Sequence, residues 1–210
     1  MPTRSIEVNE EVATGVVHKK TIDLDQTTVG CGTIPGAVSA YVTAVEEGDA
    51  LIHRTTLTCT ALPISVADDA GVAQYGGVKV YTFPEGLIAS LGAIINGNLT
   101  MGVTGTFIDA FTGVNALGSA VAGTGASLTS TEATWLQSTA NATASSKVAA
   151  ISSVSIATQL TESGGRIYDG TATAAPVFLN FAIADDASHT AGTGTFTGTI
   201  TIAWLKVGDK

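Results

Sequence analysis

A period-two pattern near the C-terminus constrains this chain more than any other feature. In the stretch TFTGTITIAWLKVG, large apolar side chains alternate with threonine. Successive side chains of a β-strand point to opposite faces, so the pattern predicts a strand with one buried face and one threonine face. The expected buried face comprises Phe196, Ile200, Ile202 and Trp204, and the opposite face comprises Thr195, Thr197, Thr199 and Thr201.

The same alternation occurs in two other segments. In PVFLNFAIADD it places Val177, Leu179, Phe181 and Ile183 on one face, and we expect this strand to form a long hairpin with the C-terminal one. In the segment 55–66, Leu57, Cys59 and Ala61 alternate with Thr56, Thr58 and Thr60, which predicts a further half-buried strand. Pro63 has no N–H, so that part of the strand should lie at a sheet edge or a bulge.

The central segments are read from turn signals and composition. Residues 78–83 form a strand-like run, and LIASLGAII at 87–95 is compatible with a helix or a buried strand, with strand favoured by its length and flanking glycines. The following NGN at 96–98 predicts a hairpin turn. The spacing of Thr129 and Glu132 matches a capping box and predicts one short helix. A further strand is expected at 147–157.

Length and composition indicate one globular body with an arm. The chain has 210 residues, 24 of them glycine, and only 13% are charged. Threonine-rich strands with many glycine turns favour an all-β fold. Residues 1–36 contain sparse apolar positions and predict an extended N-terminal arm, whereas residues 37–210 carry the strands of the domain. The N-terminus shows no apolar export signal, so Cys31 and Cys59 are expected to be reduced in a cytoplasmic setting.

The net charge of −9 argues against two classes of partner. Non-specific nucleic-acid binding depends on lysine and arginine side chains that neutralise phosphates, and anionic membrane surfaces attract the same groups. We therefore expect neither nucleic acid nor a membrane as a partner.

The stretch ADDASH at 184–189 supplies the candidate metal ligands Asp185, Asp186 and His189. Two carboxylates and an imidazole are a ligand set that zinc accepts. However, adjacent residues of a strand point to opposite faces, and aspartate pairs are common where a chain turns. The near-copy ADDAG at 67–71 has the same acidic pair without a histidine. A structural turn is therefore favoured over a metal site.

The remaining motifs predict no catalytic residue and no cofactor. Glu46, Glu47 and Asp49 form an acidic group whose spacing does not match a calcium loop, so a solvated turn is expected. The sequence contains no nucleophile elbow, phosphate-binding loop or zinc-protease motif. We therefore expect a protein that is not an enzyme.

Two long stretches resemble structural proteins of tailed bacteriophages, namely HRTTLTCTALPISVADDAGVAQYGGVKVYTFPEGLI and FLNFAIADDASHTAGTGTFTGTITIAWL. The resemblance is to decoration, or cement, proteins of the phage head, and it extends from about Tyr41 to Gly208. It is one of pattern, without catalytic motifs to carry over.

The resemblance implies a jelly-roll-like antiparallel β-sandwich that assembles as a homotrimer on the lattice of the major capsid protein. It places the chain on the outer surface of the virion, where it stabilises the capsid. The alternative is a head-fibre or tail adhesin domain that binds host surface glycan. That alternative requires exposed aromatic side chains on one surface, and the aromatic residues are scattered along the sequence.

Overall fold

The computed structural model describes residues 21–22, 32–48, 52–69, 73–107, 109–123, 128–156, 167–184 and 189–208. Within these ranges the chain forms β-strands and two short 3₁₀ turns. They are β1 (Thr21–Ile22), η1 (Gly36–Val38), β2 (Val42–Gly48), β3 (Ile52–Asp69), β4 (Ala73–Thr82), β5 (Gly86–Thr104), β6 (Gly113–Gly118), η2 (Thr131–Ala133), β7 (Leu136–Ala140), β8 (Val148–Ile156), β9 (Ile167–Gly170), β10 (Pro176–Ala184) and β11 (Gly192–Gly208). No helix in the described part is long and apolar enough to span a membrane.

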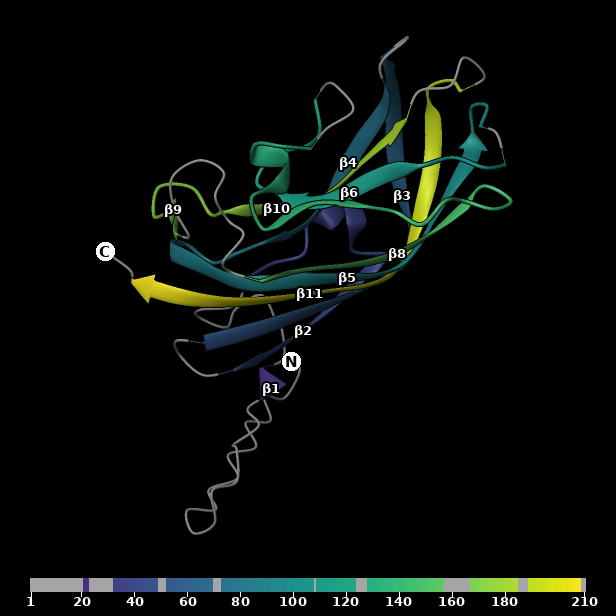
Figure 1. Ribbon diagram of the computed structural model, residues 1–210. Coiled ribbons are helices and arrows are strands. Elements are labelled where there is room, and N and C mark those ends of the chain that lie inside the picture. Colours follow the sequence, from purple (N-terminus) through teal and green to yellow (C-terminus); the bar gives the residue numbers. More distant parts are fainter. Residues whose placement is uncertain are drawn as a thin grey trace.

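All the strand pairs are antiparallel, and the strands follow the order β7-β6-β10-β4-β3-β11-β5-β8, with β2 and β1 beside β3 and with β9 beside β5. The long strands β5 and β11 curve, so that β4, β6 and β10 lie over the rest of the sheet as a second layer (Figure 1). The N–H of Ala142, just after β7, donates to the carbonyl of Ala150 in β8, which brings the two ends of the sheet together. The expected all-β antiparallel sandwich is confirmed, in a nearly closed form.

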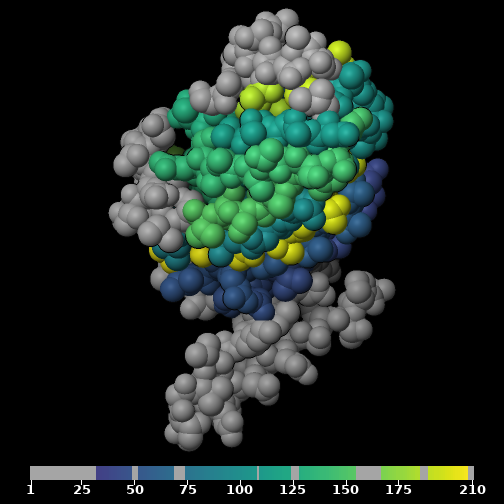
Figure 2. Space-filling view, turned by 45° about the vertical axis from the view of Figure 1, so that its right-hand side comes forward, coloured from purple at the N-terminus to yellow at the C-terminus, as the bar shows by residue number. Residues whose placement is uncertain are grey.

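One layer presents β2, β3, β11, β5 and β8 side by side. Figure 2 shows these strands as neighbouring bands, from blue through yellow and teal to green. The opposite side of the same strands faces the core, where Leu57, Ile95, Ile151 and Ile200 are among the buried side chains. This layer positions the site described below.

The alternation correctly identifies which side chains are buried. The eight apolar positions predicted in β10 and β11 are each at most 1% exposed. The predicted hairpin between these two strands is wrong, however, because β10 pairs with β4 and β6, whereas β11 pairs with β3 and β5. A period-two pattern specifies the buried face of a strand but not its neighbour in the sheet.

Strand β3 contains a β-bulge that the sequence pattern does not reveal. Its register with β11 shifts between Phe196 and Gly198, and Ala61 adopts a left-handed φ of 48° there. The N–H of Ala61 donates to Thr197 Oγ1 at 3.0 Å. The extra residue inverts the alternation, so Ala61 is exposed although it was predicted on the buried face. Pro63 lies beyond the pairing with β2 and before that with β4, as its missing N–H requires.

The strand interpretation of residues 87–95 is confirmed, but the predicted hairpin turn at NGN is wrong. Gly97 lies in the middle of β5, where it pairs with Gly198 of β11. The two glycines allow the backbones to approach closely where both strands curve. Residues 96–98 therefore lie where two paired strands approach closely, and they form no turn.

The predicted capping box is also replaced by a different contact. Only the single 3₁₀ turn η2 forms, and its N-cap residue is Ser130, without a side-chain cap. Glu132 instead accepts a hydrogen bond from the N–H of Ser130 at 3.2 Å. The short turn is held mainly from outside, because the Asn180 side chain donates to the carbonyls of Ala120 and Glu132.

Most of the predicted arm lies outside the described residues. Of residues 1–36, the structure describes 21–22 and 32–36. Strand β1 pairs with β2 at Glu46 and Glu47. Thr33 exchanges backbone hydrogen bonds with Thr82 of β4. The C-terminal end of the predicted arm thus adds to the body of the sandwich.

Candidate functional site

The structure describes the two acidic segments to different extents. Asp185 and Asp186 lie outside the described residues, whereas His189 is described and is only 4% exposed. Its Nδ1 lies 3.1 Å from Gln74 Oε1, and Gln74 Nε2 donates to Asp68 Oδ1 at 3.0 Å. His189 therefore connects the start of β11 to the hairpin between β3 and β4, which contains ADDAG.

Among the described residues there is no group of three or more histidine, cysteine, aspartate or glutamate side chains that could hold a metal ion. The His189 ring packs 5.1 Å from that of Phe107, centroid to centroid. The described contacts of His189 favour a structural role.

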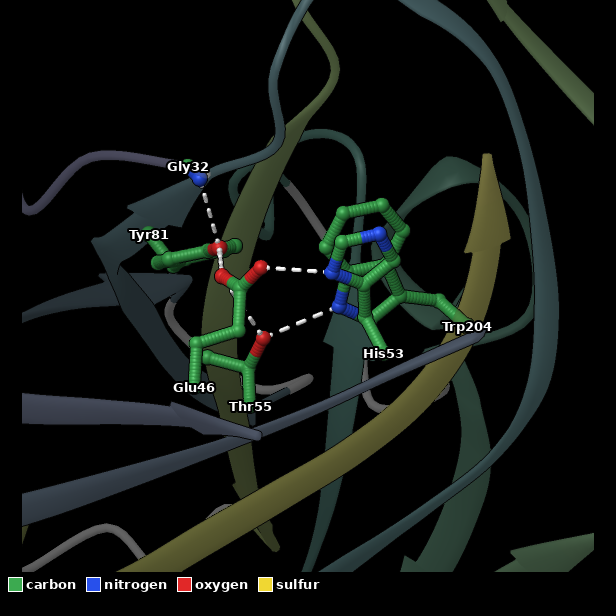
Figure 3. Close-up of polar contacts among 6 residues, drawn as sticks. All are labelled: Gly32, Glu46, His53, Thr55, Tyr81 and Trp204. Atoms are coloured by element: carbon green, nitrogen blue, oxygen red, sulfur yellow. Dashed lines mark hydrogen bonds and ion pairs between the residues drawn. The ribbon is translucent and has the colours of Figure 1, made fainter. Parts of the chain in front are cut away.

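A buried polar cluster lies elsewhere in the described part of the chain, where the sequence predicts a solvated turn. Glu46 is fully buried in β2, so that expectation is wrong for this residue; Asp49 lies outside the described residues. Glu46 contacts two side chains of β3 and one of β4, and Trp204 of β11 completes the cluster (Figure 3). We refer to Glu46, His53, Thr55, Tyr81 and Trp204 as the polar cluster.

Local strand geometry explains how these side chains meet. Along β2, the inward positions are Val42, Ala44 and Glu46, so the carboxylate follows two apolar residues on the core face. Glu46 is paired with Thr55 of β3, and His53 lies two residues away on the same face. Extending the alternation of Leu57 and Cys59 toward the N-terminus would have placed His53 and Thr55 inward. This alternation is the signal in the sequence that points to the two residues.

Glu46 is the acceptor at the centre of the polar cluster. Its Oε1 lies 2.7 Å from His53 Nδ1, and its Oε2 accepts from the Tyr81 hydroxyl at 2.7 Å. Thr55 Oγ1 lies 3.5 Å from Oε2, at the long limit of a hydrogen bond. Where the carboxylate oxygen accepts in this contact, Nδ1 of His53 is the donor.

The outer members of the polar cluster complete the network. Trp204 Nε1 donates to Thr55 Oγ1 at 2.9 Å, and its indole stacks on the His53 ring at 4.0 Å between centroids. The Gly32 N–H donates to the Tyr81 oxygen at 3.0 Å. Burial, and then the negative charge of Glu46, raise the pKa of Tyr81 well above its ordinary value. The phenol thus remains protonated and continues to donate to the carboxylate.

A carboxylate that orients an imidazole through Nδ1 is an arrangement that enzymes use for general base catalysis. The nitrogen that would act in such a reaction is His53 Nε2. In the described part of the chain this atom is buried and has no hydrogen-bond partner. The side-chain hydrogen bonds of Glu46 and Thr55 to described residues lie within the polar cluster. The arrangement ties four strands and the Gly32 segment together, and this geometry favours a structural role.

Alkaline pH is expected to destabilise the fold through a second buried group in β3. Burial raises the pKa of the Cys59 thiol to about 12, whereas an unfolded cysteine titrates near about 8.5. Between these values the unfolded chain releases a proton that the folded chain retains. The thiol therefore leaves the free energy of unfolding unchanged below about pH 8.5. Above that pH the free energy of unfolding falls, by at most about 1.4 kcal/mol per pH unit.

Urea unfolding followed between pH 7 and pH 10 measures this effect. Because Cys59→Ala removes the thiol, the variant should lose stability less steeply than the wild type over the upper half of that range. The same pH dependence in both proteins would show that Cys59 does not cause it.

Comparisons with known proteins identify no relative. No family model matches the chain, and neither the curated proteins nor the solved structures contain a match.

Proposed function

We propose that this chain is a virion structural protein that binds the outside of a phage capsid and stabilises the lattice of the major capsid protein. The observation that carries the proposal is the closed polar cluster. The clustered ionisable groups of the sandwich are sealed among β2, β3, β4 and β11. The chain therefore offers its partners surfaces instead of a reactive site, in agreement with the resemblance to decoration proteins.

The mechanism of such a protein is linkage. A protein that binds the mature shell more tightly than its precursor stabilises the mature shell by the difference in binding free energy. Many copies on one lattice add their contributions, so a weak contact per copy is sufficient. The partners are then the capsid shell and other copies of this chain. The homotrimer implied by the resemblance remains a prediction.

The rival function, glycan binding by a fibre or adhesin, receives less support from the structure. Indole rings are the best stacking surfaces for sugars, but Trp135 and Trp204 are both buried, at 2% and 0% exposed. Trp204 serves the polar cluster, and Trp135 packs against Phe83 and Tyr168.

Immunogold labelling of virions with an antibody against this chain tests the proposal. Gold over the faces of mature heads is the expected result. Labelling of tail tips or fibres would support the adhesin instead, and virions without label would contradict both functions.

We propose that the N-terminal arm binds the capsid or a neighbouring subunit. A deletion designed from the structure should end at residue 20, because β1, Gly32 and Thr33 bond to the sandwich. The shortened protein is expected to fold with an unchanged unfolding midpoint but to lose head binding in co-sedimentation. Undiminished head binding would show that the arm is not the grip.

A further inference from the structure

The outward side of the layer β2-β3-β11-β5-β8 is a surface built from aligned rows of side chains. We call it the outer face. Directly paired residues of antiparallel strands project from the same side of a sheet, so the register defines each row. One row contains Val45, Thr56, Thr201, Ile94 and Val154, and the next contains Thr43, Thr58, Thr199, Asn96 and Ser152.

Exposed apolar side chains concentrate on the outer face. In the first row, Val45 is 49% exposed, Ile94 39% and Val154 59%. Two more exposed apolar residues, Ile52 and Val148, lie on the same strands. Contiguous exposed apolar side chains on a protein surface often mark an interaction site.

The central rows of the outer face carry no net charge, although the chain carries a net charge of −9. Over β2, residues 52–60 of β3, residues 86–100 of β5, residues 195–205 of β11 and β8, the charged side chains of the outer face are Glu47 and Arg54. These two form an ion pair with each other. The further charged residues of these strands, Asp68, Asp69 and Lys206, lie beyond these bounds. Two copies of an acidic chain repel each other least where both surfaces are neutral, so charge favours this face for self-association.

The size of the outer face is sufficient for a stable contact. Five strands at a spacing of about 4.8 Å and about nine residues along each strand give roughly 24 Å by 30 Å, or about 700 Å². Stable protein–protein contacts bury about 600–1,000 Å² on each partner, so this area lies within their range. Apolar and threonine rows without isolated charges can be covered without leaving a buried charge unpaired.

We propose that the outer face is where one copy of this chain packs against another. The inference does not depend on capsid binding, because it rests on the apolar rows, the neutrality and the area of the surface itself. It goes beyond the proposed function by assigning the contact between copies to named strands.

The test measures molar mass by size-exclusion chromatography with light scattering. One chain has a mass of 21.1 kDa. The wild type is expected at a multiple of that mass, and the double variant Ile94→Arg/Val154→Arg at the mass of one chain. Thr199→Arg, in the neighbouring row, replaces an exposed polar residue and is expected to shift the equilibrium in the same direction without affecting the core.

Val121→Arg is the matched control, because Val121 is an exposed apolar residue (46%) in the segment after β6, outside the outer face. Its mass should equal that of the wild type. A monomeric wild type, or variants of the outer face that keep the oligomeric mass, would overturn the proposal. If the wild type is monomeric and Thr199→Arg abolishes head binding, the outer face belongs to the capsid contact instead of to a second copy.

Discussion

Replacement of Glu46 by alanine is expected to lower the free energy of unfolding by about 2–6 kcal/mol, because two buried donors lose their acceptor and each costs about 1–3 kcal/mol. The carboxylate is fully buried and accepts from His53 and Tyr81, both at 2.7 Å. Without it, the imidazole N–H and the phenol O–H remain buried without an acceptor, and each such donor is costly to desolvate. Urea unfolding at neutral pH measures the loss.

The adjacent residue provides a matched control. Glu47 belongs to the same strand, but its ion pair with Arg54 lies at the surface, where the arginine side chain is 60% exposed. Solvent-exposed pairs contribute about 0–1 kcal/mol, so Glu47→Ala should cost no more than that. Comparable losses in the two variants would contradict the central role of Glu46 in the polar cluster.

The second large effect is expected where Gly97 of β5 is paired with Gly198 of β11. In Gly198→Ala the new Cβ would lie 2.6 Å from Gly97 Cα and closer still to the carbonyl oxygen of Asn96. Both are backbone atoms of the neighbouring strand, so relief requires β5 and β11 to move apart. We expect a loss of about 2–3 kcal/mol, typical of an overpacked core.

Gly36→Ala is the control for this substitution, since a Cβ at Gly36 meets nothing within 4 Å. A change within about 0.5 kcal/mol is expected there, as for most surface substitutions. Thermal and urea unfolding of the two variants should therefore separate clearly. A Gly198→Ala protein as stable as the wild type would show that the two strands can part without cost.

The polar cluster links the fold to the segment that precedes it. Gly32 donates to Tyr81, and Tyr81 donates to Glu46, so the end of the predicted arm is bonded to the same carboxylate that holds β2 to β3. Strand β1 pairs with β2 at Glu46 itself. If the arm binds a capsid or a neighbouring copy, force on it is transmitted to the buried polar cluster of the sandwich.

Sequence reasoning failed at this cluster for a physical reason. Glu46, His53 and Thr55 come from one hairpin and could have been recognised by alternation, but Tyr81 and Trp204 arrive from strands distant in the chain. The hydrogen bond between Thr55 and Trp204 spans 149 residues. From the sequence alone, Glu46 beside Glu47 is interpreted as part of a solvated turn, because its distant partners are not evident in the sequence.

The sequence alone determined the local properties of this protein: β-strands as the dominant element, the buried faces of β10 and β11, and the edge position of Pro63. These depend on the alternation of side chains and on the missing N–H of proline, which act within a few residues. Only the tertiary structure shows which strands are neighbours, where β3 bulges, and that NGN at 96–98 pairs with β11 instead of forming a turn. Those outcomes depend on contacts between residues far apart in the chain, because side-chain period specifies a face but leaves the partner of each strand open.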